Sequence, residues 1–141
     1  MTASYADTLA RVNYSEIDQM GVVYHARYAV WLDIARTESL RKAGMSYRDL
    51  EAMGFFLVVG DLTMRYHHPA RYDDLVRVRC WVRELASRRV TFAYRLTHAE
   101  TGNLLVTAET RMLSLNHQFV PTRLPARGAT LVVKHPFPVR I

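Results

Sequence analysis

The stretch Tyr14–Glu38, YSEIDQMGVVYHARYAVWLDIARTE, joins a polar loop to a long helix pattern. Asp18 lies in the loop, and the first half of the helix pattern is apolar at nearly every position. A helix that is apolar on all sides is typical of a buried element. The sequence therefore predicts a loop over residues 15–26 and a buried helix over residues 26–43, whose polar second half emerges into solvent. Gly44 suits the left-handed residue that ends a helix.

The position of Asp18 ahead of this helix indicates a type of chemistry. The first backbone N–H groups of a helix lack intrahelical partners, and the helix dipole favours negative charge there. A carboxylate is able to act as a nucleophile or as a general base, and the N–H groups of Tyr24 and His25 are candidates to hold a developing oxyanion. Acyl transfer needs both functions in one place.

Beyond the helix the pattern changes to strands. Residues 55–68, FFLVVGDLTMRYHH, read as one long strand with Gly60 as a candidate bulge. Apolar and polar residues alternate between Val76 and Val82, which predicts a half-buried strand. The other predicted elements are a first strand over 8–14, a short helix opened by a capping box of Ser46 and Asp49 and stopping near Gly54, a strand over 90–96, a turn at Glu100–Asn103, a strand over 104–115 and a short strand over 130–134.

This order of elements predicts the fold class. A single antiparallel sheet has to cover its apolar face, and the helix over residues 26–43 is the only long element available to do so. We therefore expect an α+β fold in which about five antiparallel strands wrap one long helix. The 141 residues suit a single domain over 1–141. The apolar segment FFLVVGDL is expected to pair with a second copy across a two-fold axis, because an open edge strand is a liability.

Composition limits the classes of function. The net charge of +6 indicates an anionic partner, although no run of five Lys or Arg residues indicates a nucleic-acid patch. No apolar run reaches the roughly 18 residues of a membrane helix, and no secretory signal is recognisable, so a cytoplasmic location is expected. Cys80 is the single cysteine and is expected to be a buried thiol.

The histidines show no metal-ligand spacing, so no metal is expected. A phosphate-cradling glycine loop and a Gly-x-Ser-x-Gly elbow are both missing, which argues against a P-loop enzyme and an α/β-hydrolase.

The motif and the order of elements together resemble the hot-dog-fold acyl-CoA thioesterases. The pattern is most similar to the 4-hydroxybenzoyl-CoA thioesterase group, in its bacterial branch associated with the Tol–Pal system. The resemblance implies a hot-dog fold, an acyl-CoA substrate, no cofactor beyond the coenzyme A of the substrate, and a homodimer or homotetramer. The residues that carry it are Tyr14, Asp18, Gly21–Ala26, Tyr28, Trp31, Ala35–Glu38, Tyr66–Asp74 and Arg89–Phe92.

The candidate site residues follow from the motif and the resemblance. Asp18 is the nucleophile or the general base, and both roles stay open. The resemblance implies a catalytic contribution from His25 and a place for Tyr14 in the site. An apolar acyl pocket is expected near Tyr28 and Trp31. The remaining candidates for substrate binding are Gly21, Val23 and Tyr24 in the motif, with Arg88 and Arg89 as candidates for the phosphates of coenzyme A.

Other readings remain open at this point. Glu38 is expected to form a structural ion pair with Arg41 or Lys42 rather than to act in catalysis. A hot-dog hydratase or dehydratase is the alternative enzyme. A binding module for nucleic acid or for an acyl carrier protein is the non-enzymatic alternative.

Overall fold

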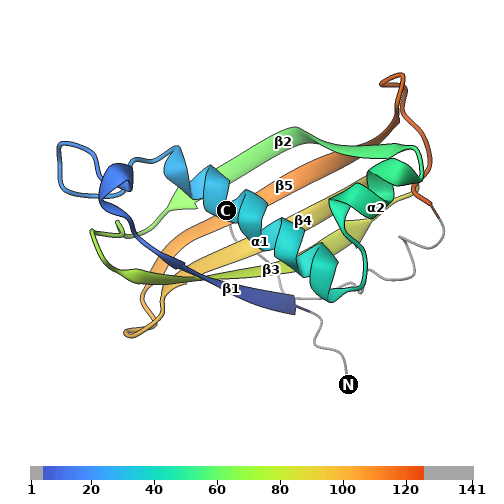
Figure 1. Cartoon of the computed structure of the whole chain (residues 1–141). Coiled ribbons are helices and arrows are strands. Elements are labelled where there is room, and N and C mark those ends of the chain that lie inside the picture. Colours follow the sequence, from blue (N-terminus) through green and yellow to red (C-terminus); the bar gives the residue numbers. More distant parts are fainter. Residues whose placement is uncertain (1–4, 126–141) are drawn as a thin grey trace.

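The computed structural model describes residues 5–125, which form one antiparallel sheet with a long helix across one of its faces (Figure 1). The strand order is β1-β3-β4-β5-β2, so β1 and β2 are the two edges. The expected α+β arrangement of five strands and one long helix is confirmed. In chain order the elements are β1 (Tyr5–Arg11), a 3₁₀ turn (Tyr14–Glu16), α1 (Arg27–Lys42), α2 (Tyr47–Ala52), β2 (Phe55–Tyr66), β3 (Leu75–Leu85), β4 (Arg89–His98) and β5 (Leu104–Asn116).

The core lies between α1 and the sheet. The predicted alternation in β3 is confirmed, because Val76, Val78, Cys80 and Val82 all face the core and are at most 5% exposed. Alternate residues of β4 and β5 complete the same apolar layer. Burial raises the pKa of the Cys80 thiol to about 12. The prediction of a buried structural thiol is therefore confirmed.

Helix α1 is buried on one side only, which corrects the expectation of a helix surrounded by protein. Val30 and Ile34 are 41% and 47% exposed, because a single sheet covers a single helix face. In the second half, which was expected in solvent, Arg36 is only 5% exposed. Arg36 follows Trp31 and Leu32 at helical spacing, so its side chain enters the buried face.

The structure confirms several predicted features of the helices and strands and shifts the ends of others. The capping box of Ser46 and Asp49 opens α2. Gly60 lies at a shift of register between β2 and β5, and a Cβ there would approach the Leu113 side chain to 3.1 Å. The first strand ends at Arg11 instead of Tyr14, because residues 14–16 form the 3₁₀ turn. The predicted strand over 130–134 lies outside the described residues.

Strand β2 leaves one edge of the sheet open within the described chain. It pairs with β5 on one side only, and it carries the exposed apolar residues Val59 and Leu62. Its last residue, Tyr66, lies at the end of the sheet where α1 begins. No helix within residues 5–125 is both long and apolar enough to cross a membrane.

Candidate active site

Asp18 occupies a tight turn between the 3₁₀ turn and α1. Its backbone N–H donates to Val22 O at 2.9 Å, and the N–H of Gly21 donates to Asp18 O at 3.0 Å. Gly21 adopts a φ of 78°, which a side chain would strain. The carboxylate atom Oδ1 accepts the N–H of Met20 at 2.8 Å, whereas Oδ2 accepts no hydrogen bond from the described residues. One oxygen therefore holds the turn and the other is free to react.

The end of β2 and the segment that follows it hold the Asp18 turn against α1. Val23 is 4% exposed, and its N–H donates to Ala70 O at 2.9 Å. The N–H of Ala70 in turn donates to the Tyr28 hydroxyl at 3.1 Å. The hydroxyl of Tyr66 donates to the backbone carbonyl of His25 at 2.9 Å. Residues 66–70, distant in the sequence, thus fix the loop and the start of the helix through three hydrogen bonds.

The two residues immediately before α1, His25 and the N-cap Ala26, offer free backbone donors. Neither N–H has a hydrogen-bond partner within residues 5–125, and Ala26 supplies no side-chain cap. The Tyr24 N–H, also a candidate from the sequence, is already occupied, because it donates to Glu16 O at 2.9 Å. The exposed His25 ring lies 4.5 Å from the Tyr24 ring, centroid to centroid, and makes no hydrogen bond in the described chain. The donors available to an oxyanion are therefore those of His25 and Ala26.

Glu16 is a functional residue that the sequence analysis missed. Its carboxylate is 6% exposed, and it accepts the Trp31 indole N–H at 2.9 Å and the Asn13 N–H at 2.8 Å. Arg27 adds a contact at 3.5 Å. The spacing Asn13-x-x-Glu16 is a capping-box pattern, which was the available signal. Glu16 therefore positions the loop that carries Asp18 and the first turn of α1.

Replacement of Glu16 by Gln tests this positioning role. A Gln side chain has one acceptor oxygen, so either Trp31 or Asn13 would face an amide N–H and lose its partner. We expect the free energy of unfolding to fall by about 1–3 kcal/mol, the cost of a buried unpaired polar group. Urea denaturation measures this loss. Glu38→Gln is the matched control, since the half-exposed pair of Glu38 with Arg41 is expected to contribute under about 1 kcal/mol. Equal losses in both variants would contradict the role.

The structure places the three predicted aromatic residues differently from one another. Tyr14 is 76% exposed, and its ring packs edge-on against Tyr72 at 5.5 Å instead of closing a strand. Tyr28 and Trp31 are 2% and 4% exposed and pack against each other at 5.2 Å. Burial raises the pKa of the Tyr28 phenol, and the negative charges of Asp74 and Asp18 add to this rise.

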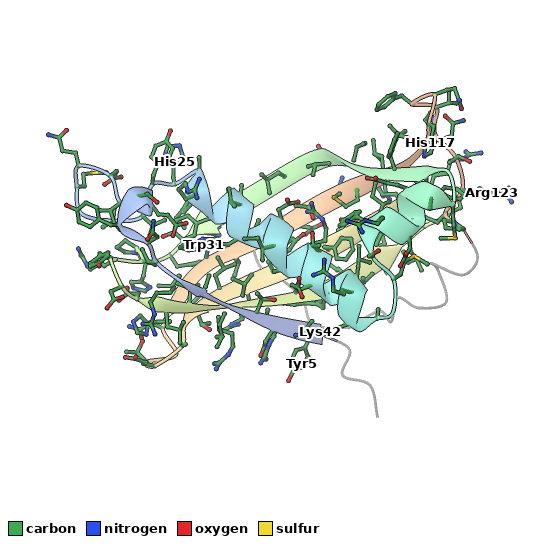
Figure 2. All side chains as sticks on the ribbon, in the orientation of Figure 1. Tyr5, His25, Trp31, Lys42, His117 and Arg123 are labelled. Carbon is green, nitrogen blue, oxygen red and sulfur yellow. The ribbon has the colours of Figure 1, made fainter. Side chains whose placement is uncertain are left out.

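The described residues form an apolar pocket that neither Tyr28 nor Trp31 lines, and the acyl pocket expected near those two residues stays a prediction. The apolar pocket opens between the C-terminal end of α1, α2 and the sheet, at the end of the molecule opposite His25 (Figure 2). Tyr28 and Trp31 belong to the buried core cluster. The lining of the apolar pocket is Leu40, Ala43, Met45, Ser46, Leu50, Leu57, Leu85, Val90, Phe92 and Leu124.

Arg88 and Arg89 also lie at this far end, so the chain does not bring them to its own Asp18. Arg89 pairs with Glu84 at 3.2 Å, whereas Arg88 has no carboxylate partner within residues 5–125. The predicted ion pair of Glu38 with Arg41 is confirmed. The described residues contain no group of three His, Cys, Asp or Glu side chains arranged to hold a metal ion.

Comparison with known proteins adds a family to this geometry. Residues 12–128 match the model of the thioesterase-like superfamily. The chain is 34% identical over 116 residues to the acyl-CoA thioester hydrolase YbgC of Escherichia coli O6:H1, covering 82% of this chain and 86% of the relative. A hypothetical protein of Thermus thermophilus superposes with a TM-score of 0.84 at 38% identity, over 89% of this chain and 95% of that one. A DHNA-CoA thioesterase of Staphylococcus aureus superposes with a TM-score of 0.81 at 35% identity, over 85% of this chain and 80% of that one. The fold is the expected hot-dog fold.

Proposed function

Because the chain belongs to the thioesterase-like superfamily, we propose that it hydrolyses the thioester bond of an acyl- or aryl-CoA. The observation that carries this proposal is the pairing of a free Asp18 oxygen with unpartnered N–H groups of His25 and Ala26. The names of the relatives support the thioester as the bond that is cleaved. The motif in residues 14–38 supports membership of the 4-hydroxybenzoyl-CoA thioesterase group in its Tol–Pal-associated branch. The cytoplasmic location stays a prediction.

The reaction proceeds at the residues that lead into α1. The thioester oxygen accepts the free N–H groups, and the carbonyl carbon becomes electrophilic. In one route Asp18 Oδ2 bonds to that carbon, the C–S bond breaks, and the thiolate leaves and takes a proton; water then cleaves the anhydride. In the other route Asp18 removes a proton from water, which attacks the same carbon; the C–S bond then breaks, and the leaving thiolate takes the proton back from Asp18. Both routes use water and protein groups, so we propose no cofactor.

A panel of acyl-CoA and aryl-CoA thioesters, read by release of free thiol, tests the proposal. We expect hydrolysis of at least one member and none with Asp18→Ala. The same panel includes an enoyl-thioester, which is assayed for hydration. Hydration of this substrate without thiol release would favour the hydratase alternative over the thioesterase. Lack of thiol release on every member, with capture of an acyl carrier protein, would favour the binding-module alternative.

We propose that the protein assembles through β2 into a homodimer, which is able to associate further into a tetramer. The open β2 edge, with Val59 and Leu62 exposed, supports this pairing. Antiparallel pairing across a two-fold axis brings the Phe55 end of β2 in one copy beside the Tyr66 end in the other. The apolar pocket of one copy then lies next to the α1 start of its partner.

The double substitution of Val59 and Leu62 by Asp tests the assembly. Each copy would place two negative charges at the edge, and like charges across an interface cost several kcal/mol. We expect the dimer dissociation constant to rise at least about a hundredfold, measured by light scattering over a dilution series. Leu9→Asp is the control, since Leu9 is 55% exposed on the opposite edge strand. A wild-type monomer at micromolar concentration would refute the assembly.

A further inference from the structure

The turn after β5 presents an aromatic ring to solvent in a strained conformation. Phe119 is 67% exposed with a φ of 61°, an unusual value for a bulky residue. The Asn116 side chain holds the turn, because its Oδ1 accepts the N–H groups of Gln118 at 2.9 Å and Val120 at 3.0 Å. The backbone N–H of Phe119 also donates to Asn116 O at 2.9 Å. Strain maintained by so many contacts is typical of a functional position.

Phe119 belongs to a group of three rings. The Phe56 ring stacks on His117 at 4.6 Å with an interplanar angle of 27°, and it lies 5.6 Å from Phe119 at 32°. We call Phe56, His117 and Phe119 the aromatic platform. The three rings form a stack rather than a flat surface, and the exposed Phe119 ring is suited to stacking of a planar heterocycle.

Arginine residues occur in the segment that carries His117 and Phe119. Residues 111–125 contain Arg111 and Arg123 and no carboxylate, and Arg111 lies opposite Asp61 of β2. The tip between β3 and β4 joins the same surface, because Ser114 N–H donates to Arg88 O at 2.9 Å and Leu124 N–H donates to Ser87 O at 2.7 Å. Arg88 and Arg123 make no ion pair within residues 5–125, and guanidinium groups of this kind suit phosphate. Figure 2 shows Arg123 and His117 at the same end of the molecule.

We infer that the aromatic platform, together with Arg88 and Arg123, binds the phosphorylated adenosine end of coenzyme A. The inference rests on the proposed function for the identity of the ligand. Adenine stacks on Phe119, and the two guanidinium groups contact the phosphates. Because Phe56 and Tyr66 are ten residues apart on β2, about 33 Å at the rise of a strand, the platform does not serve the Asp18 of its own chain. Antiparallel pairing of β2 brings it to the α1 start of the second copy.

Calorimetric titration with adenosine 3′,5′-bisphosphate alone tests the site without any catalysis. We expect Phe119→Ala to weaken binding about tenfold, in line with the loss of one stacked base, and Phe119→Trp to retain it. Leu9→Ala, at an exposed apolar residue on the far edge strand, is expected to bind as the wild type does. Arg123→Ala is expected to weaken binding and to flatten its dependence on salt, whereas the exposed Arg95→Ala is expected to change neither.

The kinetic arm uses two substrates with the same acyl group. With acyl-CoA, Phe119→Ala is expected to raise KM and leave kcat unchanged, since the nucleotide binds equally in the ground and transition states. With acyl-pantetheine, which lacks the nucleotide, no change is expected. Unchanged bisphosphate binding in both the Phe119 and Arg123 variants would overturn the inference. Conversion of Phe119→Ala to a monomer in light scattering would also overturn it, by showing that the platform is a subunit contact. Bisphosphate binding that depends on Phe119 in a protein without hydrolytic activity would refute the proposed function and leave the site standing.

Discussion

Asp18→Asn is expected to lower kcat by at least about a hundredfold, the low end for loss of a positioned base. The Asn amide is neither a nucleophile nor a base, so both routes are blocked. Its side-chain oxygen still accepts the Met20 N–H, which holds the turn at 2.8 Å in the wild type. The fold is therefore expected to survive. Steady-state release of thiol measures kcat, and the thermal unfolding midpoint shows whether the turn is intact.

The control for this substitution is Glu100→Gln. Glu100 is an exposed carboxylate in the turn between β4 and β5, at the same end of the sheet as the start of α1 but outside the Asp18 turn. The Glu100→Gln substitution removes one negative charge, as Asp18→Asn does. An effect of net charge on the binding of an anionic substrate therefore appears in both variants. A loss of kcat confined to Asp18→Asn supports the assignment. Turnover near the wild-type value in Asp18→Asn would remove Asp18 from the mechanism.

Arg36→Ala is expected to produce the largest loss of stability. Arg36 Nε donates to the Tyr47 hydroxyl at 2.7 Å, and Nη1 donates to the Tyr94 hydroxyl at 3.2 Å. The guanidinium also pairs with Asp33, so one side chain joins α1 to α2 and to β4. Truncation removes these bonds and leaves a cavity in the buried face. We expect the free energy of unfolding to fall by about 3 kcal/mol, measured by urea denaturation.

Two further variants separate the causes of that loss. Arg36→Met keeps much of the side-chain volume, and Tyr94 retains its hydrogen bond to Thr110 at 2.8 Å. We therefore expect Arg36→Met to lose clearly less stability than Arg36→Ala, since an apolar residue of similar size is often tolerated in place of a buried charge. Arg95→Ala, at an exposed position, is expected to stay within about 0.5 kcal/mol of the wild type. Equal stability of Arg36→Ala and Arg95→Ala would show that the network contributes nothing.

The same residues show what local sequence patterns reveal and what they miss. Alternation predicted the buried residues of β3, and the capping pattern of Ser46 and Asp49 predicted α2, because both depend on neighbours in the chain. The burial of Arg36 depends on Tyr94, which is 58 residues away, so the polar composition of residues 36–42 placed it in solvent. Val30 and Ile34 were placed in the core because periodicity does not report how many sides of a helix are covered.

The candidate site was predicted in part for the same reason. The loop position of Asp18 and the helix start follow from local order, and the structure brings them together. Glu16 was missed because its burial depends on Trp31, which reaches it only after the loop folds back. The distance of Arg88 and Arg89 from Asp18 depends on the direction of each strand, which short motifs do not encode.

Cys80 has a practical consequence for measurement. A thiol reacts with colorimetric disulfide reagents as its thiolate, and burial raises the pKa of Cys80 to about 12. Because Cys80 is the only cysteine and is fully enclosed by the core, the folded protein is expected to give no background colour near neutral pH. The signal in such an assay then reports the liberated coenzyme alone, and a slow rise in the blank reports unfolding of the enzyme.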